Sequence, residues 1–259
     1  MPYPGYDAGP GDFEKRGESM PNGGRERVIQ KLDISSLTEE QLAKTIDHAV
    51  LKPSSTEVQI KEGCSIALKY KVAAICVNPC YVRLCADILK NSEVKVDAVI
   101  GFPLGANAPV IKKAEAQRAV EDGAAELDVV LNIGALKEGD YKYVREEIRQ
   151  VVEAGRGALV KVILETCYLN EHEKIEACKL AEEAGAHYVK TSTGFGPEGA
   201  KVEDIKLMYR TVGPRLGVKA SGGIRGLSDA LAMIEAGATR LGTSATQTIM
   251  EDWVSRNYK

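Results

Sequence analysis

The sequence predicts an α/β protein folded as one closed barrel of eight parallel strands and eight outer helices, the (β/α)8 or TIM-barrel class. Short apolar segments alternate along the chain with amphipathic stretches, as such a barrel requires. The apolar segments show no polar face, which is typical of buried parallel strands. A chain of 259 residues with 44% hydrophobic composition also has the usual size of one such domain.

The first part of the chain differs in composition from the rest. Residues 1–27 are rich in Gly, Pro and charged residues and show no hydrophobic periodicity. This composition predicts a flexible leader, which we extend to residues 1–34, and places the barrel domain at residues 35–259. Ser36 and Glu39 have the spacing of a capping box, so we expect a short helix there before the first strand.

Eight segments have the length and apolar character of barrel strands. The stretches between them, such as EVQIKEGCSIALKY and YVREEIRQVVEAG, carry apolar residues at helical spacing. Gly123, Gly185 and Gly237 are each followed by Ala and predict a tight turn from a helix into the next strand. The expected strands are residues 45–51, 73–78, 96–102, 126–132, 159–165, 187–193, 216–222 and 240–245.

Composition argues against several classes of function. The formal net charge of -3 leaves no basic excess for a nucleic-acid partner. No apolar run reaches the length of a membrane span and no secretory signal is recognisable, so we expect no membrane partner and a cytoplasmic location. The six cysteines include no CxxC pair and are interpreted as buried small hydrophobes in a reducing compartment. With three scattered histidines, we expect no metal and no cofactor.

Three lysines lie at equal intervals within apolar strand segments. Lys161, Lys190 and Lys219 are 29 residues apart, in LVKVIL, YVKTST and GVKASG. A buried ammonium without a partner is costly, so this repeat indicates amine chemistry, and a Schiff-base enzyme is the first interpretation. The alternative is that each lysine points outward or pairs with a carboxylate inside the barrel.

A lysine must lose its proton to act as a nucleophile, and its ordinary pKa of about 10.4 prevents this at neutral pH. A second ammonium about 6 Å away, at an effective dielectric of about 20, contributes roughly 3 kcal/mol of repulsion. Lys190 and Lys219 lie on consecutive strands and can supply such a pair. This interpretation requires both side chains to share one compartment, and a tight carboxylate pair at Lys190 would count against it.

Asp128 lies in ELDVVLN, where a carboxylate among β-branched residues needs a cation or a proton to transfer. We interpret it as an acid-base group, with charge balance for a lysine as the alternative. The loops after the last three strands indicate an anion site, because small residues near helix starts expose backbone N–H groups. The candidate anion-binding residues are Gly194, Gly222, Gly223, Gly242 and Ser244, with help from Arg225 unless Arg225 forms only a surface ion pair.

The segments GFPLGAN, ELDVVLNIGALK, LVKVILETCYL, YVKTSTGFG and VKASGGIR together resemble the deoxyribose-phosphate aldolase family, over about residues 40–250. The resemblance implies a class I aldolase that reversibly cleaves 2-deoxy-D-ribose 5-phosphate to acetaldehyde and D-glyceraldehyde 3-phosphate. It makes Lys190 the Schiff-base nucleophile and Lys219 the positive charge that favours the neutral amine. Asp128 becomes the group that transfers protons through water.

The same resemblance implies roles for further residues. Asp47, taken to end the first strand, is expected close to the substrate, and Thr191 is expected in the substrate site. Cys76 and Lys161 are candidates for lining that site. Members of the family often form dimers or tetramers, so we expect a homodimer or homotetramer.

The chain departs from the family pattern at Ala49, at Ala108 and Pro109, and at Ala245, where hydroxyl residues are common. At residue 245 the backbone N–H is expected to stay available to phosphate, so binding should weaken but persist. Tyr258 is a candidate proton donor that would fold back over the site, although chain ends commonly fray. Two alternatives stay open: an aldolase for another phosphosugar, and a degraded barrel that binds without turnover.

Overall fold

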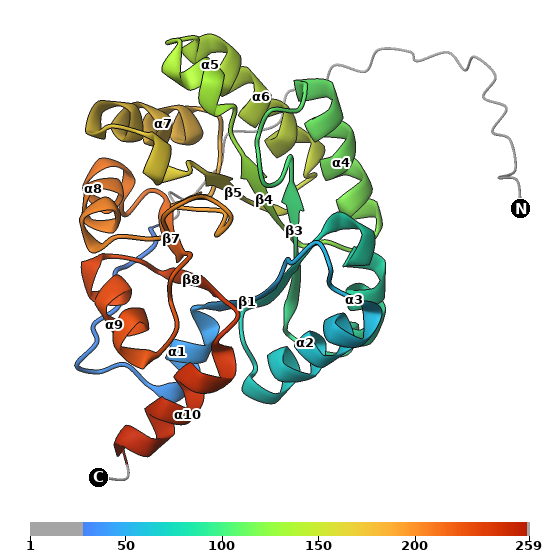
Figure 1. Cartoon of the computed structure of the whole chain (residues 1–259), viewed down its shortest axis with the longest axis vertical. Helices are drawn as coiled ribbons and strands as arrows, with labels where there is room; N and C mark the ends of the chain where they lie inside the picture. Colours follow the sequence, from blue (N-terminus) through green and yellow to red (C-terminus); the bar gives the residue numbers. More distant parts are fainter. Residues whose placement is uncertain (1–27, 258–259) are drawn as a thin grey trace, which may run out of the picture.

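The computed structural model describes residues 28–257 and shows a closed barrel of parallel strands, surrounded by helices (Figure 1). Neighbouring strands follow the order of the sequence, and β1 pairs with β8 to close the barrel. The predicted fold class is therefore confirmed. The strands are β1 (Ile46–Val50), β2 (Ala74–Val77), β3 (Lys95–Ile100), β4 (Glu126–Val130), β5 (Leu159–Ile163), β6 (Tyr188–Lys190), β7 (Gly217–Ser221) and β8 (Arg240–Thr243).

The helices lie outside the strands and cover them on all sides (Figure 1). They are α1 (Glu39–Lys44), α2 (Glu57–Tyr70), α3 (Val82–Leu89), α4 (Pro109–Glu121), α5 (Ile133–Lys137), α6 (Tyr141–Ala154), α7 (Glu171–Glu183), α8 (Val202–Val212), α9 (Leu227–Ala236) and α10 (Thr246–Asn257). Two short 3-10 turns, Pro79–Tyr81 and Thr166–Tyr168, follow β2 and β5. The short helix α5 lies between β4 and α6, and the sequence analysis does not predict it. None of the helices among residues 28–257 has the length and apolarity of a membrane span.

The predicted strands agree with the observed ones except at their ends. β3 begins one residue early, at Lys95, and ends at Ile100, two residues before the prediction. β6 ends at Lys190, three residues before the prediction, although Thr191 N–H still donates to Lys219 O at 3.1 Å. Apolar and β-branched residues continue past these ends, so composition alone overestimates the strand length.

The helix termini follow the sequence signals with one correction. α1 is capped by Thr38 and not by Ser36: Gln41 N–H donates to Thr38 Oγ1 at 3.2 Å, and Thr38 N–H donates to Gln41 Oε1 at 2.9 Å. The predicted box at Ser36 and Glu39 is wrong because the helix starts later, after a turn at Asp33 whose side chain accepts from Ser35 N–H. The turns at Gly123, Gly185 and Gly237 are confirmed by positive φ angles of 106°, 84° and 121°.

The N-terminal boundary of the domain stays a prediction. Residues 1–27 lie outside the described residues. Within the predicted leader, Ile29 N–H donates to Pro214 O at 2.8 Å, and Leu32 packs against the core. Residues 28–34 therefore contact the barrel, although the sequence analysis assigns them to the leader.

The barrel contains two different interiors. The outer one, between strands and helices, is apolar and includes Ile75, Leu127 and Val162. The inner one is charged: Asp47, Asp97, Asp128, Lys161 and Lys219 are all completely buried inside the ring of strands. Side chains alternate between the two interiors along each strand, because successive residues of a strand point to opposite faces.

The cap of α1 can be tested by unfolding. We expect Thr38→Ala to lower the free energy of unfolding by about 1 kcal/mol, because the backbone N–H of Gln41 loses its acceptor. Urea unfolding measures the change. Ser36→Ala is the matched control and should change stability much less, and an equal loss in both variants would contradict the assigned cap.

Candidate active site

A cavity of about 640 Å³ opens at the carboxyl ends of the strands. Its wall is made by the loops that follow β1, β6, β7 and β8, and two lysines from β6 and β7 reach it from below. The residues predicted for the site that line this cavity are Cys76, Lys190, Gly194, Lys219, Gly222, Gly223, Arg225, Gly242 and Ser244. The structure thus brings together the amine and anion parts of the predicted site.

Four other predicted residues do not line the cavity: Asp47, Asp128, Lys161 and Thr191 are buried beneath it or beside it. Asp47 is the second residue of β1, so the expectation that it ends the first strand is wrong. Thr191 Oγ1 donates to Ser221 O at 3.2 Å and accepts from Ser221 N–H at 3.1 Å. It therefore joins the ends of β6 and β7.

Asp128 lies at the centre of the charged interior and contacts three ammonium groups. Lys190 Nζ donates to Asp128 Oδ2 at 2.6 Å, and Lys219 Nζ donates to the same oxygen at 2.7 Å. Lys161 Nζ donates to Asp128 Oδ1 at 2.8 Å. The strand register brings these groups together. Asp128 on β4 is the register partner of Lys161 on β5, and Lys190 on β6 is the register partner of Lys219 on β7.

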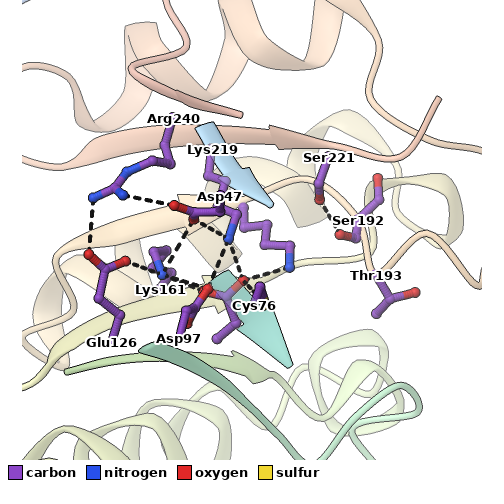
Figure 2. A network of polar contacts seen from close by, with 12 residues as sticks. Asp47, Cys76, Asp97, Glu126, Lys161, Ser192, Thr193, Lys219, Ser221 and Arg240 are labelled. Carbon is purple, nitrogen blue, oxygen red and sulfur yellow. Dashed lines mark hydrogen bonds and ion pairs between the residues drawn. The ribbon is translucent and has the colours of Figure 1, made fainter. Parts of the chain in front are cut away.

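The remaining charges of the cluster are paired around Asp47, Glu126 and Arg240 (Figure 2). Arg240 bridges Asp47 at 2.8 Å and Glu126 at 3.2 Å, as Figure 2 shows. Asp47 also pairs with Lys219 at 2.6 Å, and Glu126 pairs with Lys161 at 2.8 Å. The described cluster thus holds four acids and four bases: Asp47, Asp97, Glu126 and Asp128 with Lys161, Lys190, Lys219 and Arg240.

Burial and pairing act in opposite directions on the ionisation of these groups. Burial opposes the charge of Asp128, but Lys161, Lys190 and Lys219 outweigh it and hold the pKa of Asp128 well below its usual range. Burial likewise opposes the charge of Lys219, but Asp128 and Asp47 raise its pKa above the ordinary value. Both groups are therefore ionised in the resting protein.

The proximity of Lys190 and Lys219 is confirmed, since both donate to one oxygen. The contact between Lys190 and Asp128 is a carboxylate pair of the kind that counts against a reactive amine. Asp128 does not pair with Lys190 alone, however, because it also forms ion pairs with Lys161 and Lys219. One carboxylate cannot neutralise three ammonium groups, and the other acids of the cluster contact Lys161, Lys219 and Arg240.

The loops at the opposite wall carry glycines in the left-handed region of backbone conformation. Gly194, Gly222 and Gly223 have φ angles of 85°, 83° and 82°, which other residues adopt at a cost. A Cβ on Gly199 would lie 2.2 Å from Gly222 O, so the loops after β6 and β7 pack backbone against backbone. Arg225 is exposed and lines the cavity.

The expectation for Ala245 is corrected by the structure. Ala245 N–H donates to Thr243 Oγ1 at 2.9 Å and is therefore not available to an incoming phosphate. Lys52 is exposed and lines the cavity beside β1. Tyr258 lies outside the described residues.

Glu165 is a buried residue of the site that the sequence analysis does not single out. It adopts φ 53°, unusual for a residue other than glycine, and both carboxylate oxygens accept from Thr193 N–H at 3.2 Å. The Thr193 hydroxyl also donates to Glu165 Oε2. Burial raises the pKa of Glu165 against these hydrogen bonds. The contact joins the loop after β5 to the start of the loop that carries Gly194.

The cluster also includes Asp97, Glu126 and Arg240, which sequence analysis leaves out. The signal for Asp97 is present, because VDAVIGF contains an acid among apolar residues as ELDVVLN does. Two acid groups, one around Cys76 and one around Glu126, bring ligand atoms close enough to hold a metal ion. The carboxylates of both groups are already paired with the ammonium groups of Lys161 and Lys219.

The prediction for the cysteines is correct for four of six. Cys64, Cys76, Cys85 and Cys178 are buried, whereas Cys80 is exposed and Cys167 is partly exposed. Cys80 and Cys167 belong to the short turns that follow β2 and β5. Loop positions at the mouth of the barrel face solvent, so their apolar character does not guarantee burial.

A parallel barrel with a lysine at the floor of its carboxyl-end cavity, beside a second ammonium and an acid, is the arrangement of a Schiff-base aldolase. Residues 41–249 match the family model described as "DeoC/LacD family aldolase", and the chain belongs to this family.

Individual relatives agree with this assignment. The chain is 58% identical to the deoxyribose-phosphate aldolase of Thermococcus gammatolerans over 214 residues, which cover 81% of this chain and 95% of the relative. It is 56% identical to that of Caldanaerobacter subterraneus subsp. tengcongensis over 215 residues, covering 82% and 93%. A tetrameric deoxyribose phosphate aldolase from Aeropyrum pernix matches with a TM-score of 0.80 at 34% identity, covering 85% of this chain and 93% of that one.

The charge on Asp128 gives a pH-dependent contribution to stability. Its pKa lies below the unfolded value, so its stabilisation is complete above about pH 4 and is lost as the pH falls through the folded-state pKa. We expect Asp128→Asn to lower the free energy of unfolding by about 3–5 kcal/mol at pH 7, because it leaves buried ammonium groups unpaired. The deficit should shrink at pH 3.

Urea unfolding of both proteins at pH 7 and pH 3 measures this effect. Asp87→Asn, at an exposed position of α3, is the control and should have little effect at either pH. An Asp128→Asn deficit of the same size at both pH values would contradict the assigned ionisation.

Proposed function

We propose that this chain is a class I deoxyribose-phosphate aldolase that acts through a Schiff base on Lys190. It reversibly cleaves 2-deoxy-D-ribose 5-phosphate to acetaldehyde and D-glyceraldehyde 3-phosphate. The observation that carries the proposal is the shared contact of Lys190 and Lys219 with Asp128, directly below a cavity. The names of the relatives support the choice of substrate.

The reaction begins with a proton transfer from the Lys190 ammonium to Asp128, which lies 2.6 Å away and accepts the proton directly. The free amine then attacks the C1 aldehyde of the open-chain sugar and forms a carbinolamine. Asp128 returns the proton to the leaving hydroxyl, so water departs and a protonated imine forms. In this structure the contact is direct, whereas the resemblance implies a proton path through water.

The protonated imine at C1 accepts the electron pair of the C2–C3 bond when that bond breaks. The C3 hydroxyl loses its proton and becomes the aldehyde of D-glyceraldehyde 3-phosphate, which leaves, and an enamine of acetaldehyde stays on Lys190. Protonation of the enamine carbon and addition of water release acetaldehyde and restore the amine. Asp128 is the described acid-base group nearest to the nitrogen, and it gives and takes the protons of these steps.

Lys219 acts as a fixed positive charge in this scheme. Its ammonium is paired with Asp47 at 2.6 Å and with Asp128 at 2.7 Å, and these acids keep it protonated. Its charge disfavours a second ammonium at residue 190 and favours the neutral amine. Lys161 donates to the other carboxylate oxygen of Asp128 and does not line the cavity, so its charge acts on Asp128 from below.

The phosphate is assigned to the wall formed by Gly194, Gly222, Gly223 and the segment from Gly242 to Ser244. Backbone N–H groups at these loops and the Arg225 guanidinium supply positive potential. Phe195, half-exposed and edge-on to Phe102 at 5.3 Å between ring centroids, adds an apolar part to this wall. The reaction as drawn needs neither metal nor cofactor, because the imine itself withdraws the electrons.

We further propose a homodimer or homotetramer, in line with the tetrameric relative from Aeropyrum pernix. A cytoplasmic location is also proposed, in keeping with six free cysteines, since thiols persist in reducing compartments. The partners are then the phosphosugar and short aldehydes alone.

Trapping tests the nucleophile, the substrate and the mechanism together. Incubation with 2-deoxy-D-ribose 5-phosphate and sodium borohydride should reduce the imine and leave a stable adduct on the peptide that contains Lys190, as mass spectrometry can show. Lys190→Ala should lose at least about 10⁴-fold in turnover, as expected when a covalent nucleophile is removed.

Lys95→Ala, at the exposed first residue of β3, is the matched control and should retain full activity. An adduct on another lysine would overturn the assignment of Lys190. Cleavage of a different phosphosugar, with none of deoxyribose phosphate, would overturn the substrate but keep the Schiff base.

The phosphate assignment predicts a selective effect at Arg225. We expect Arg225→Ala to raise KM for 2-deoxy-D-ribose 5-phosphate by roughly tenfold, the cost of one charge-assisted hydrogen bond. Activity on unphosphorylated 2-deoxy-D-ribose should not change. Arg210→Ala on α8 serves as the control for general loss of surface charge, and equal effects of Arg225→Ala on both sugars would contradict the assignment.

A further inference from the structure

Asp97 is a charged residue of the barrel interior that the proposed mechanism does not use. It comes from β3, is completely buried, and its Oδ2 lies 3.0 Å from Lys161 Nζ and 3.2 Å from Lys219 Nζ. Its other oxygen, Oδ1, has no hydrogen-bond partner among residues 28–257. A buried carboxylate oxygen without a donor is costly when the group is ionised.

The other three acids of the cluster are held more tightly. Asp47, Glu126 and Asp128 each have a cation at 2.8 Å or closer. Lys161 and Lys219, the two cations that contact Asp97, both approach Asp128 more closely than Asp97. Asp97 is therefore the acid of the cluster whose negative charge is least compensated.

The groups that face Asp97 come from five other strands. Lys161 on β5 and Lys219 on β7 stabilise its charge, whereas Asp128 on β4 and Asp47 on β1 oppose it. Glu126 on β4 and Cys76 on β2 are its register partners, and Glu126 adds a further carboxylate. Burial is the largest influence, followed by Asp128, and together they raise the pKa of Asp97 to about 6.

The charge balance of the cluster depends on this one group. With every group ionised, four acids face four bases. When Lys190 is a neutral amine, the bases are reduced to three and one negative charge is in excess. Protonation of Asp97 removes this excess, so the neutral amine and the protonated Asp97 fit together.

We propose that Asp97 is a positioning residue whose protonation sets the fraction of Lys190 that is present as free amine. An ionised Asp97 favours the ammonium of Lys190 through Lys219 and Asp128, and a protonated Asp97 favours the amine. The inference rests on the proposed role of Lys190 as nucleophile. It extends that role, because it names an internal site that can hold the proton while Asp128 exchanges protons with the substrate.

The test is the pH dependence of kcat/KM in Asp97→Asn, a neutral side chain of the same shape. We expect the acidic limb of the profile to shift to lower pH by about one unit, the effect of losing one buried negative neighbour. The rate on the plateau should stay within a few fold of the wild type. A changed rate with an unmoved acidic limb would show a merely structural role and overturn the inference.

Glu147→Gln is the matched control. Glu147 is a buried carboxylate 2.8 Å from Lys112 Nζ, outside the cluster, so its loss should affect stability but leave the acidic limb in place. A similar shift in Glu147→Gln would also overturn the inference, because it would reveal a general effect of removing buried charge.

A second measurement needs neither turnover nor a variant that folds. In wild-type protein labelled with ¹³C at aspartate carboxyl groups, one buried resonance should titrate between about pH 5 and pH 7. The same resonance should be missing from Asp97→Asn where that variant folds. If no aspartate titrates in this range, the inference fails. If the resonance titrates but the wild type cleaves no sugar, the proposed function fails instead.

Discussion

The interior of this barrel depends on one carboxylate that receives three ammonium groups. Asp128 could not remain ionised in an apolar enclosure alone, and Lys161, Lys190 and Lys219 could not remain there without an acid. The buried acids and bases therefore stabilise one another only as a complete set. Because three ammonium groups share Asp128, the cation with the fewest other partners is the one that most easily loses its proton and becomes a neutral amine. Among the described contacts that cation is Lys190, since its only ion pair is with Asp128.

The apolar and the charged interiors have different tasks. The layer between strands and helices supplies the hydrophobic stabilisation, and its residues alternate along each strand with those of the inner cluster. Because that outer layer fixes the positions of the strands, the inner lysines and acids meet at hydrogen-bond distance. The costs of burying eight charged groups are thereby offset by packing elsewhere in the same strands.

Much of the architecture follows from the sequence, because buried parallel strands and amphipathic helices leave clear patterns. The lysine repeat also indicates the reactive strands, since a core seldom buries three evenly spaced ammonium groups unless they have a chemical task. Less could be predicted about partners. Asp47 and Asp97 meet Lys219 from strands distant in the sequence, and only the stagger of a closed barrel determines their relative height. Glu165 could not be predicted because its role depends on a backbone conformation that no residue pattern encodes.

The amine and the walls of the cavity come from different parts of the fold. Strands supply Lys190, Lys219 and Asp128, whereas loops supply Gly194, Gly223 and Arg225. Loops accept insertions and substitutions that strands do not. Recognition of the substrate can thus diverge while the bond-breaking apparatus stays intact, so this barrel is a scaffold on which new aldehyde acceptors can be selected by exchanging its rim alone.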